Sequence, residues 1–179
     1  MEEEKREDSQ AKIPTVKYYA GVGSRKTPED ILEMMTKIAE GLSRNYILRS
    51  GGADGADSAF ERGAGNKKIS YIPWPGFNGS KEKCINVSSA AMKLASEFHP
   101  GWMYLSYGAR KLHARNGYQI LGEGLDTPAD FVICWTPGGK DVGGTGQAIR
   151  IAKANRVKVF NLANNEDFNF WKDKLCQTG

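Results

Sequence analysis

The sequence predicts an α/β fold: a three-layer sandwich in which a mainly parallel β-sheet carries helices on both faces. Short apolar runs of strand type alternate with longer segments whose apolar residues recur at helical spacing. Three of the candidate strands run directly into glycine-rich turns. Regular alternation of strands and helices is typical of parallel sheets, because a crossover helix has to return the chain to the starting edge.

Length and composition favour one domain. The chain has 179 residues, 40% of them hydrophobic, which is enough for a sizeable core. We assign residues 13–179 to this domain and predict that residues 1–12 form a disordered acidic tail, because residues 1–10 contain five acids and two bases. Without those ten residues the formal net charge rises from +4 to +7. Such a charge favours anionic partners, either nucleotides or more loosely nucleic acid, although an ordinary solvated basic surface has the same composition.

The first predicted unit is a strand, a turn and a helix. The strand covers residues 16–22 and is followed by Gly23. Thr27 is expected to cap the helix and Pro28 to occupy its first position. The later strands are predicted over residues 46–50, 69–72, 130–135 and 157–162, and the later helices from Ala56, over residues 84–98, 109–121 and 147–155, and around Phe170, Trp171 and Leu175.

Two glycine clusters each follow a predicted strand and precede a predicted helix. The first is Gly51-Gly52-Ala53-Asp54-Gly55 and the second is Gly143-Gly144-Thr145-Gly146. Glycine lets backbone N–H groups approach a phosphate without a Cβ in the way, and a helix N-terminus adds a favourable dipole. Ligands of parallel sheets bind at this edge, beyond the carboxyl ends of the strands. We expect both clusters to hold one phosphate, although a tight turn with close helix packing explains either cluster alone.

Charged and amide side chains accompany these clusters. Arg25 follows the first strand and is expected to pair with a phosphate or a carboxylate, unless it is a solvated turn residue. Asp54 and Asp57 are candidates for hydrogen bonds to ribose hydroxyls, and Asp57 is equally a candidate helix cap. Arg115 and Asn116 suit recognition of a base edge or a phosphate, with a surface salt bridge as the alternative.

Aromatic residues flank the less regular segments near the same edge. One or two of them are expected to stack on a base, while most pack in the core or at its rim. They are Trp74, Phe77, Trp102, Tyr104 and Tyr107.

Several classes of protein are disfavoured. Neither glycine cluster has the lysine and hydroxyl residue of a P-loop, or the acid that follows a dinucleotide-binding fingerprint. His99 and His113 are interpreted as structural, and we expect no metal and no cofactor. Three cysteines without a Cys-x-x-Cys pair favour a reducing compartment. We expect no membrane association and a cytoplasmic location, because no apolar run approaches the ~20 residues that span a bilayer.

Five motifs together resemble the SLOG superfamily of Rossmann-like nucleotide-binding domains. They are GVGSR (21–25), SGGADGAD (50–57), ARN (114–116), DFVICWTPGG (130–139) and GGTGQA (143–148). The chain looks closest to the YpsA-related branch, beside the DNA-processing protein A (DprA) branch. The resemblance implies a Rossmann-like fold and a nucleotide-derived ligand at the strand edge. The candidate ligand-binding residues are Gly23, Ser24, Arg25, Gly51, Gly52, Ala53, Asp54, Gly55, Asp57, Arg115, Asn116, Gly138, Gly139, Gly143, Gly144, Thr145 and Gly146.

Three functions compete. The first is a sensor or sequestering protein for a nucleotide-like small molecule, such as an ADP-ribose-type signal, in a chain that is a candidate homo-oligomer. The second is an N-glycosidase (phosphoribohydrolase) acting on nucleoside monophosphates, which the resemblance to cytokinin-activating LOG proteins implies. Their motif has a glutamate shortly after its glycines, whereas residues 147–150 contain no acid here, which favours binding over hydrolysis. The third is a DprA-like mediator that binds single-stranded DNA, with nucleic acid ranked below a small molecule as the partner.

Overall fold

The structure is a computed structural model and describes residues 15–177; the tail predicted for residues 1–12 lies outside them. Its centre is a five-stranded sheet in the order β3-β2-β1-β4-β5. Every neighbouring pair of strands is parallel. The strands are β1 (Tyr18–Gly21), β2 (Ile47–Ser50), β3 (Lys68–Ser70), β4 (Phe131–Cys134) and β5 (Lys158–Asn161). The predicted α/β fold of Rossmann-like type is confirmed.

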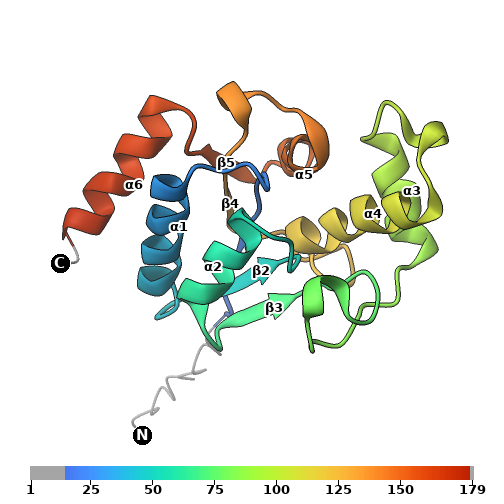
Figure 1. Ribbon diagram of the computed structural model, residues 1–179, viewed down its shortest axis with the longest axis horizontal. Coiled ribbons are helices and arrows are strands. Elements are labelled where there is room, and N and C mark those ends of the chain that lie inside the picture. The colour runs from blue at the N-terminus through green and yellow to red at the C-terminus, as the bar shows by residue number, and fades with distance from the viewer. Residues whose placement is uncertain (1–14, 178–179) are drawn as a thin grey trace, which may run out of the picture.

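Helices flank both faces of the sheet (Figure 1). On one face α1 packs against both α2 and α6. On the other face α4 packs against α5, and α3 packs on the outer part of α4. The helices are α1 (Glu29–Leu42), α2 (Ala56–Ala64), α3 (Ser89–Glu97), α4 (Tyr107–Leu121), α5 (Gly143–Ala154) and α6 (Asn165–Gln177), with short 3₁₀ turns η1 (Phe77–Gly79), η2 (Trp102–Tyr104) and η3 (Pro137–Gly139). None of the helices among residues 15–177 is long and apolar enough to span a membrane.

Both faces of the sheet are buried, which explains the unbroken apolar runs in the central strands. Successive side chains of a strand point to opposite faces. Tyr19 therefore joins the core beneath α1, α2 and α6, while Ala20 joins the core beneath α4 and α5. In β4, Ile133 belongs to the first core and Val132 to the second. A strand buried on both sides has no position for a solvated side chain.

The neighbouring strands β1 and β4 send their connections to opposite faces of the sheet. β1 leads into α1 on one face, and β4 leads into α5 on the other. The two connections diverge at the carboxyl ends of the strands and leave a crevice between them. Such a switch point is where open parallel sheets bind their ligands.

Two helix starts differ from the prediction. Thr27 is not the cap of α1: Pro28 takes the N-cap position, and the Thr27 hydroxyl donates to the Ser24 carbonyl at 2.7 Å. The helix predicted from residue 84 begins at Ser89, because the Ser88 hydroxyl accepts a hydrogen bond from the Ala91 amide and caps α3 there. Cys84 instead forms an isolated parallel bridge with Ile72.

The start of α5 is the difference that matters for the site. The sequence predicts a loop up to Gly146 and a helix from residue 147, but α5 begins at Gly143. Gly143, Gly144, Thr145 and Gly146 thus form the first turn of the helix. Glycine has low helix propensity, so local sequence favours a loop, and packing of α5 against α4 overrides that preference.

Candidate phosphate-binding pocket

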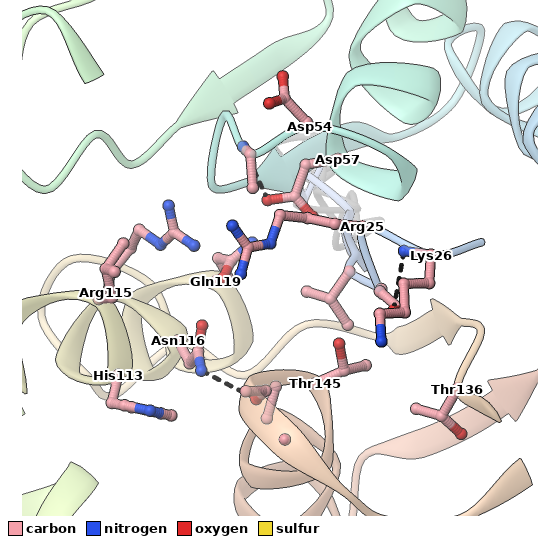
Figure 2. A pocket seen from close by; sticks show the side chains of 18 of the residues that line it. Arg25, Lys26, Asp54, Asp57, His113, Arg115, Asn116, Gln119, Thr136 and Thr145 are labelled. Atoms are coloured by element: carbon pink, nitrogen blue, oxygen red, sulfur yellow. Dashed lines mark hydrogen bonds between the residues drawn. The ribbon is translucent and has the colours of Figure 1, made fainter. Parts of the chain in front are cut away.

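A cavity of about 500 Å³ lies in the crevice at the carboxyl ends of β1 and β4 (Figure 2). Its walls come from the loops after β1, β2 and β4, from η1, from the middle of α4 and from the first turn of α5. The structure thus brings most of the candidate residues together. Those that line the cavity are Gly23, Ser24, Arg25, Ala53, Asp54, Asp57, Arg115, Asn116, Gly143, Gly144 and Thr145.

The remaining candidates do not line the cavity: they are Gly51, Gly52, Gly55, Gly138, Gly139 and Gly146. Two of them allow backbone segments to pack closely. A Cβ on Gly55 would lie 2.8 Å from the Ser24 carbonyl oxygen, and Gly55 adopts a φ of +82°. A Cβ on Gly146 would collide with the backbone of Asp141. These two glycines do not touch the cavity, but they allow the backbone segments that form its walls to pack closely.

The N-terminus of α5 presents free amides to the cavity. Val142 is the N-cap and supplies no side-chain hydrogen bond. The amides of the first three residues, Gly143, Gly144 and Thr145, have no acceptor within the helix. The prediction that Gly146 also offers its amide is wrong, because that amide donates to the Val142 carbonyl at 2.9 Å. The free amides of this turn are therefore those of the first three residues of the glycine cluster.

A polar network fixes α5 to α4. Asn116 Nδ2 donates to the Gly144 carbonyl at 3.1 Å and to Gln147 Oε1 at 2.9 Å. Gln147 Nε2 donates to the Ala95 carbonyl at 2.9 Å, which sets the orientation of the amide. The amide nitrogen of Asn116, a candidate for base recognition, is thus committed to holding the first turn of α5.

The same network sets the tautomer of His113. Its Nδ1 lies 2.9 Å from Gln147 Oε1, an acceptor, so Nδ1 carries the proton. Burial lowers the pKa of His113, and the ring is neutral near pH 7. His113 was interpreted as structural from sequence, but it lines the cavity.

Asp57 and Arg115 form a buried pair behind the first glycine cluster. Asp57 Oδ2 accepts hydrogen bonds from the amides of Gly51 at 3.2 Å and Ala53 at 3.3 Å. Arg115 Nη1 donates to the Gly51 carbonyl. The suggested role of Asp57 as a cap of α2 is wrong, since both of its amide donors precede the helix. Instead, the pair clamps the loop that leads into α2.

Burial governs the ionisation of this pair. It raises the pKa of Asp57 to about 6, although the neighbouring Arg115 charge and the two amides act in the opposite direction. Burial also lowers the pKa of Arg115, and the charges of Asp57 and Glu61 oppose that change. At pH 7 the carboxylate is mostly ionised, and its charge attracts the nearby guanidinium of Arg115.

Cationic side chains converge on the cavity. Arg25 and Lys26 are exposed on the loop after β1, where the Lys26 amide donates to Ser24 Oγ at 3.0 Å. Figure 2 shows Arg25 and Arg115 extending into the middle of the pocket from different elements. A ligand seated there meets three cationic side chains, the carboxylates of Asp54 and Asp57, and the positive end of a helix dipole.

Several lining residues were not identified as site residues from the sequence. Thr136 follows the end of β4, and Lys26 follows Arg25. Their positions near the carboxyl ends of the strands could therefore have marked them as site residues from the sequence. Gln119 lines the cavity only because α4 crosses the crevice. Asn78 lines it because its Nδ2 donates to the Gly52 carbonyl at 3.0 Å and holds η1 there. No local pattern marks these last two.

Comparisons with known proteins bear on the fold. No protein-family model and no curated protein matches the sequence. The chain is similar to DNA processing protein A from Helicobacter pylori, whose structure is described with a single-stranded DNA binding mode: the TM-score is 0.52 at 19% identity over 82% of this chain and 64% of that chain. It is also similar to DprA from Streptococcus pneumoniae, with a TM-score of 0.53 at 21% identity over 92% of this chain and 56% of that chain.

These likenesses show a DprA-like Rossmann-type fold. The chain spans less than two thirds of the length of either similar structure.

Proposed function

We propose that this chain binds single-stranded DNA and that the pocket holds one of its backbone phosphates. The observation that carries this proposal is the first turn of α5, whose open amides face a cavity that Arg25, Lys26 and Arg115 also line. Backbone amides at a helix N-terminus and cationic side chains are the groups that bind phosphate in proteins. Similarity in fold to DprA proteins, one of them described with a single-stranded DNA binding mode, supports the polymer as the ligand.

In this proposal each group has a distinct task. The amides of Gly143, Gly144 and Thr145 donate to the phosphate oxygens. Gly144 has no Cβ, so the phosphate can approach the backbone of this turn closely. Arg25 closes over the phosphate from the exposed side. Arg115 acts from the buried side, where its Nη1 is already oriented by the Gly51 carbonyl. The site reads the backbone and leaves sequence preference to other contacts.

A free nucleotide or nucleotide-derived signal is the second candidate, and the size of the cavity favours it. A volume of about 500 Å³ lies within the range of small-molecule sites, ~300–1,000 Å³. Asp54 lines the same cavity and can accept a hydrogen bond from a ribose hydroxyl. The other lining carboxylate, Asp57, accepts two backbone amides and holds the loop after β2.

The two candidates separate in a competition experiment. Fluorescence anisotropy with a labelled oligothymidine of about 20 nucleotides should show saturable binding to the full chain. Adenosine monophosphate and ADP-ribose, measured by calorimetry, should bind far more weakly and displace the oligonucleotide only at high concentration. Tight binding of a mononucleotide without any binding of the oligonucleotide would refute the DNA proposal and favour the second candidate.

A further inference from the structure

A row of aromatic side chains leads out of the pocket. Phe77 lines the cavity, and the Arg115 guanidinium carbon lies 5.3 Å from its ring centroid. The ring of Trp74 lies 5.2 Å from that of Phe77 in an edge-to-face arrangement. Trp74 in turn borders the start of α4: a Cβ on Gly108 would lie 4.0 Å from Trp74 Cζ3. Tyr107 directly precedes Gly108 at the start of α4. We call Phe77, Trp74 and Tyr107 the aromatic row.

The aromatic row ends at a groove on the outer side of α3 and α4. The groove has a volume of about 300 Å³ and is lined by Met92, Lys93, Ser96, Trp102, Tyr107 and Arg110. In Figure 1 this region lies where α4 extends away from the sheet towards α3. Tyr107 thus belongs both to the row and to the groove.

Large side chains are exposed here to an unusual extent. Tyr104 is 94% exposed and Tyr107 is 68% exposed, and Met103 beside them is 79% exposed. Exposed apolar side chains that gather in one place mark interaction surfaces more often than scattered ones do.

Cations accompany the rings along this path. Lys111 Nζ lies 5.0 Å from the centroid of the Tyr107 ring, and the Arg110 guanidinium carbon lies 5.5 Å from that of Trp102. The residues that line the groove include two cations and no carboxylate. On α4, positions 107, 111 and 115 are spaced four residues apart and share a helix face. One stripe of α4 therefore connects exposed Tyr107, through Lys111, to Arg115 in the pocket.

We propose that the aromatic row, the groove and the neighbouring Tyr104 of η2 form a second contact surface, on which unpaired bases stack while Lys111 and Arg110 hold their phosphates. This inference rests on the proposed DNA binding, and it adds the path that the strand follows beyond the pocket. The alternation of rings and cations identifies the partner. Base–aromatic stacking combined with a cationic track is how proteins hold single strands without reading sequence.

The inference predicts a dependence on strand length. A dinucleotide fills the pocket alone, whereas a strand of about ten nucleotides also reaches Tyr107 and Tyr104. Stacking contributes ~1–3 kcal/mol per base, so losing one ring weakens binding about 5- to 150-fold. We expect Tyr107→Ala and Tyr104→Ala each to lower the affinity for the longer strand within this range and to leave the affinity for the dinucleotide unchanged.

The matched controls are Tyr107→Phe and Tyr104→Phe, which keep the ring and remove only the hydroxyl. Both should bind the longer strand as the unmodified chain does. All four variants should retain the thermal unfolding midpoint of the unmodified chain, because both side chains are exposed. Photocrosslinking with an oligonucleotide that carries 5-iodouracil should attach the strand to Tyr107 or Tyr104 in the unmodified chain.

The outcomes distinguish this inference from the proposed function. If the unmodified chain binds the long strand but the alanine variants bind it equally well, the second contact surface is refuted and the pocket proposal stands. If the unmodified chain binds no oligonucleotide, both fail. If sedimentation shows a dimer that Tyr107→Ala dissociates while DNA binding persists unchanged, the groove belongs to a second copy of the chain, which also refutes the inference.

Discussion

Asp57 and Arg115 carry opposite charges into the interior behind the pocket. Removing two charges from water is costly, and the pair is tolerated because each partner also makes backbone hydrogen bonds. Asp57 holds the amides of Gly51 and Ala53, and Arg115 holds the Gly51 carbonyl. The space for this arrangement exists because residue 51 is glycine: a Cβ there would lie 2.7 Å from the guanidinium carbon. At the residue scale, the first glycine cluster serves this clamp.

The ionisation of Asp57 should appear in the pH dependence of stability. Its pKa is about 6 in the folded chain and near 3.9 when unfolded, so the folded state binds more protons between these values. The stabilising contribution of Asp57 is full below about pH 4 and is lost as the pH rises through 6. Between pH 4 and pH 7 the unmodified chain should lose about 2 kcal/mol relative to Asp57→Asn.

Urea unfolding of both proteins across this pH range measures the difference directly. The comparison with Asp57→Asn is itself the control, because all other titrating groups are common to the two proteins and cancel. A difference in unfolding free energy that stays constant with pH would contradict the burial-raised pKa.

Arg25 should contribute to binding and not to the fold. It is exposed on the loop after β1 and lines the pocket. We expect Arg25→Ala to weaken oligonucleotide binding by ~1.5–3 kcal/mol, the usual worth of a charge-assisted hydrogen bond. Arg44→Ala is the matched control, because Arg44 is also exposed but lies between α1 and β2, at the amino end of the strands. Equal affinities of the two variants would remove Arg25 from the site.

Among the elements, α5 decides how the pocket binds an anion. Its first turn consists of glycines and a threonine, which disfavour helix formation in isolation. Asn116 and Gln147 hold that turn against α4, so tertiary hydrogen bonds stabilise what local propensity does not. The result is a helix end with open amides and little side-chain bulk over them.

Two glycines of this turn should respond differently to substitution. At Gly144 the nearest atom to an added Cβ is His113 Cε1, at 3.9 Å, so Gly144→Val should fold and lose ligand binding sharply. At Gly146 a Cβ collides with the Asp141 backbone, so Gly146→Ala should destabilise the chain by ~1–3 kcal/mol. Thermal unfolding and anisotropy on both variants test the contrast. A Gly144→Val variant with full affinity would refute the anion site, and one that unfolds would assign Gly144 a packing role.

For the whole molecule, charge predicts a salt dependence. If a strand contacts Arg25, Lys26 and Arg115, it releases about three counterions, and the slope of log affinity against log salt is about −2 for single strands. Raising the salt concentration fourfold should then weaken oligonucleotide binding by roughly 10- to 20-fold. Anisotropy titrations at several salt concentrations measure the slope, and lithium and potassium salts of one anion provide the control for ion-specific effects. A slope near zero would contradict phosphate binding by these cations.

The fold could be predicted from the sequence in most respects, and the site in part. All five strands lie within about two residues of their predicted ranges. For the central strands the reason is that burial on both faces leaves a local apolar run. Arg25, Asp54 and Thr145 were identified because they adjoin strand ends or a helix start. Gln119 and Asn78 were not, because they reach the pocket from α4 and η1, which follow no strand end directly.

By itself, the sequence determined the class of fold and the edge of the sheet at which polar and glycine residues gather. Both follow from periodicity and from local chain order. Only the tertiary structure decided that Asp57 and Arg115 clamp a loop, that α5 begins at Gly143, and that Phe77 and Trp74 pack together beside the pocket. These depend on packing between segments distant in sequence, whose energies outweigh local propensity and leave no pattern within either segment.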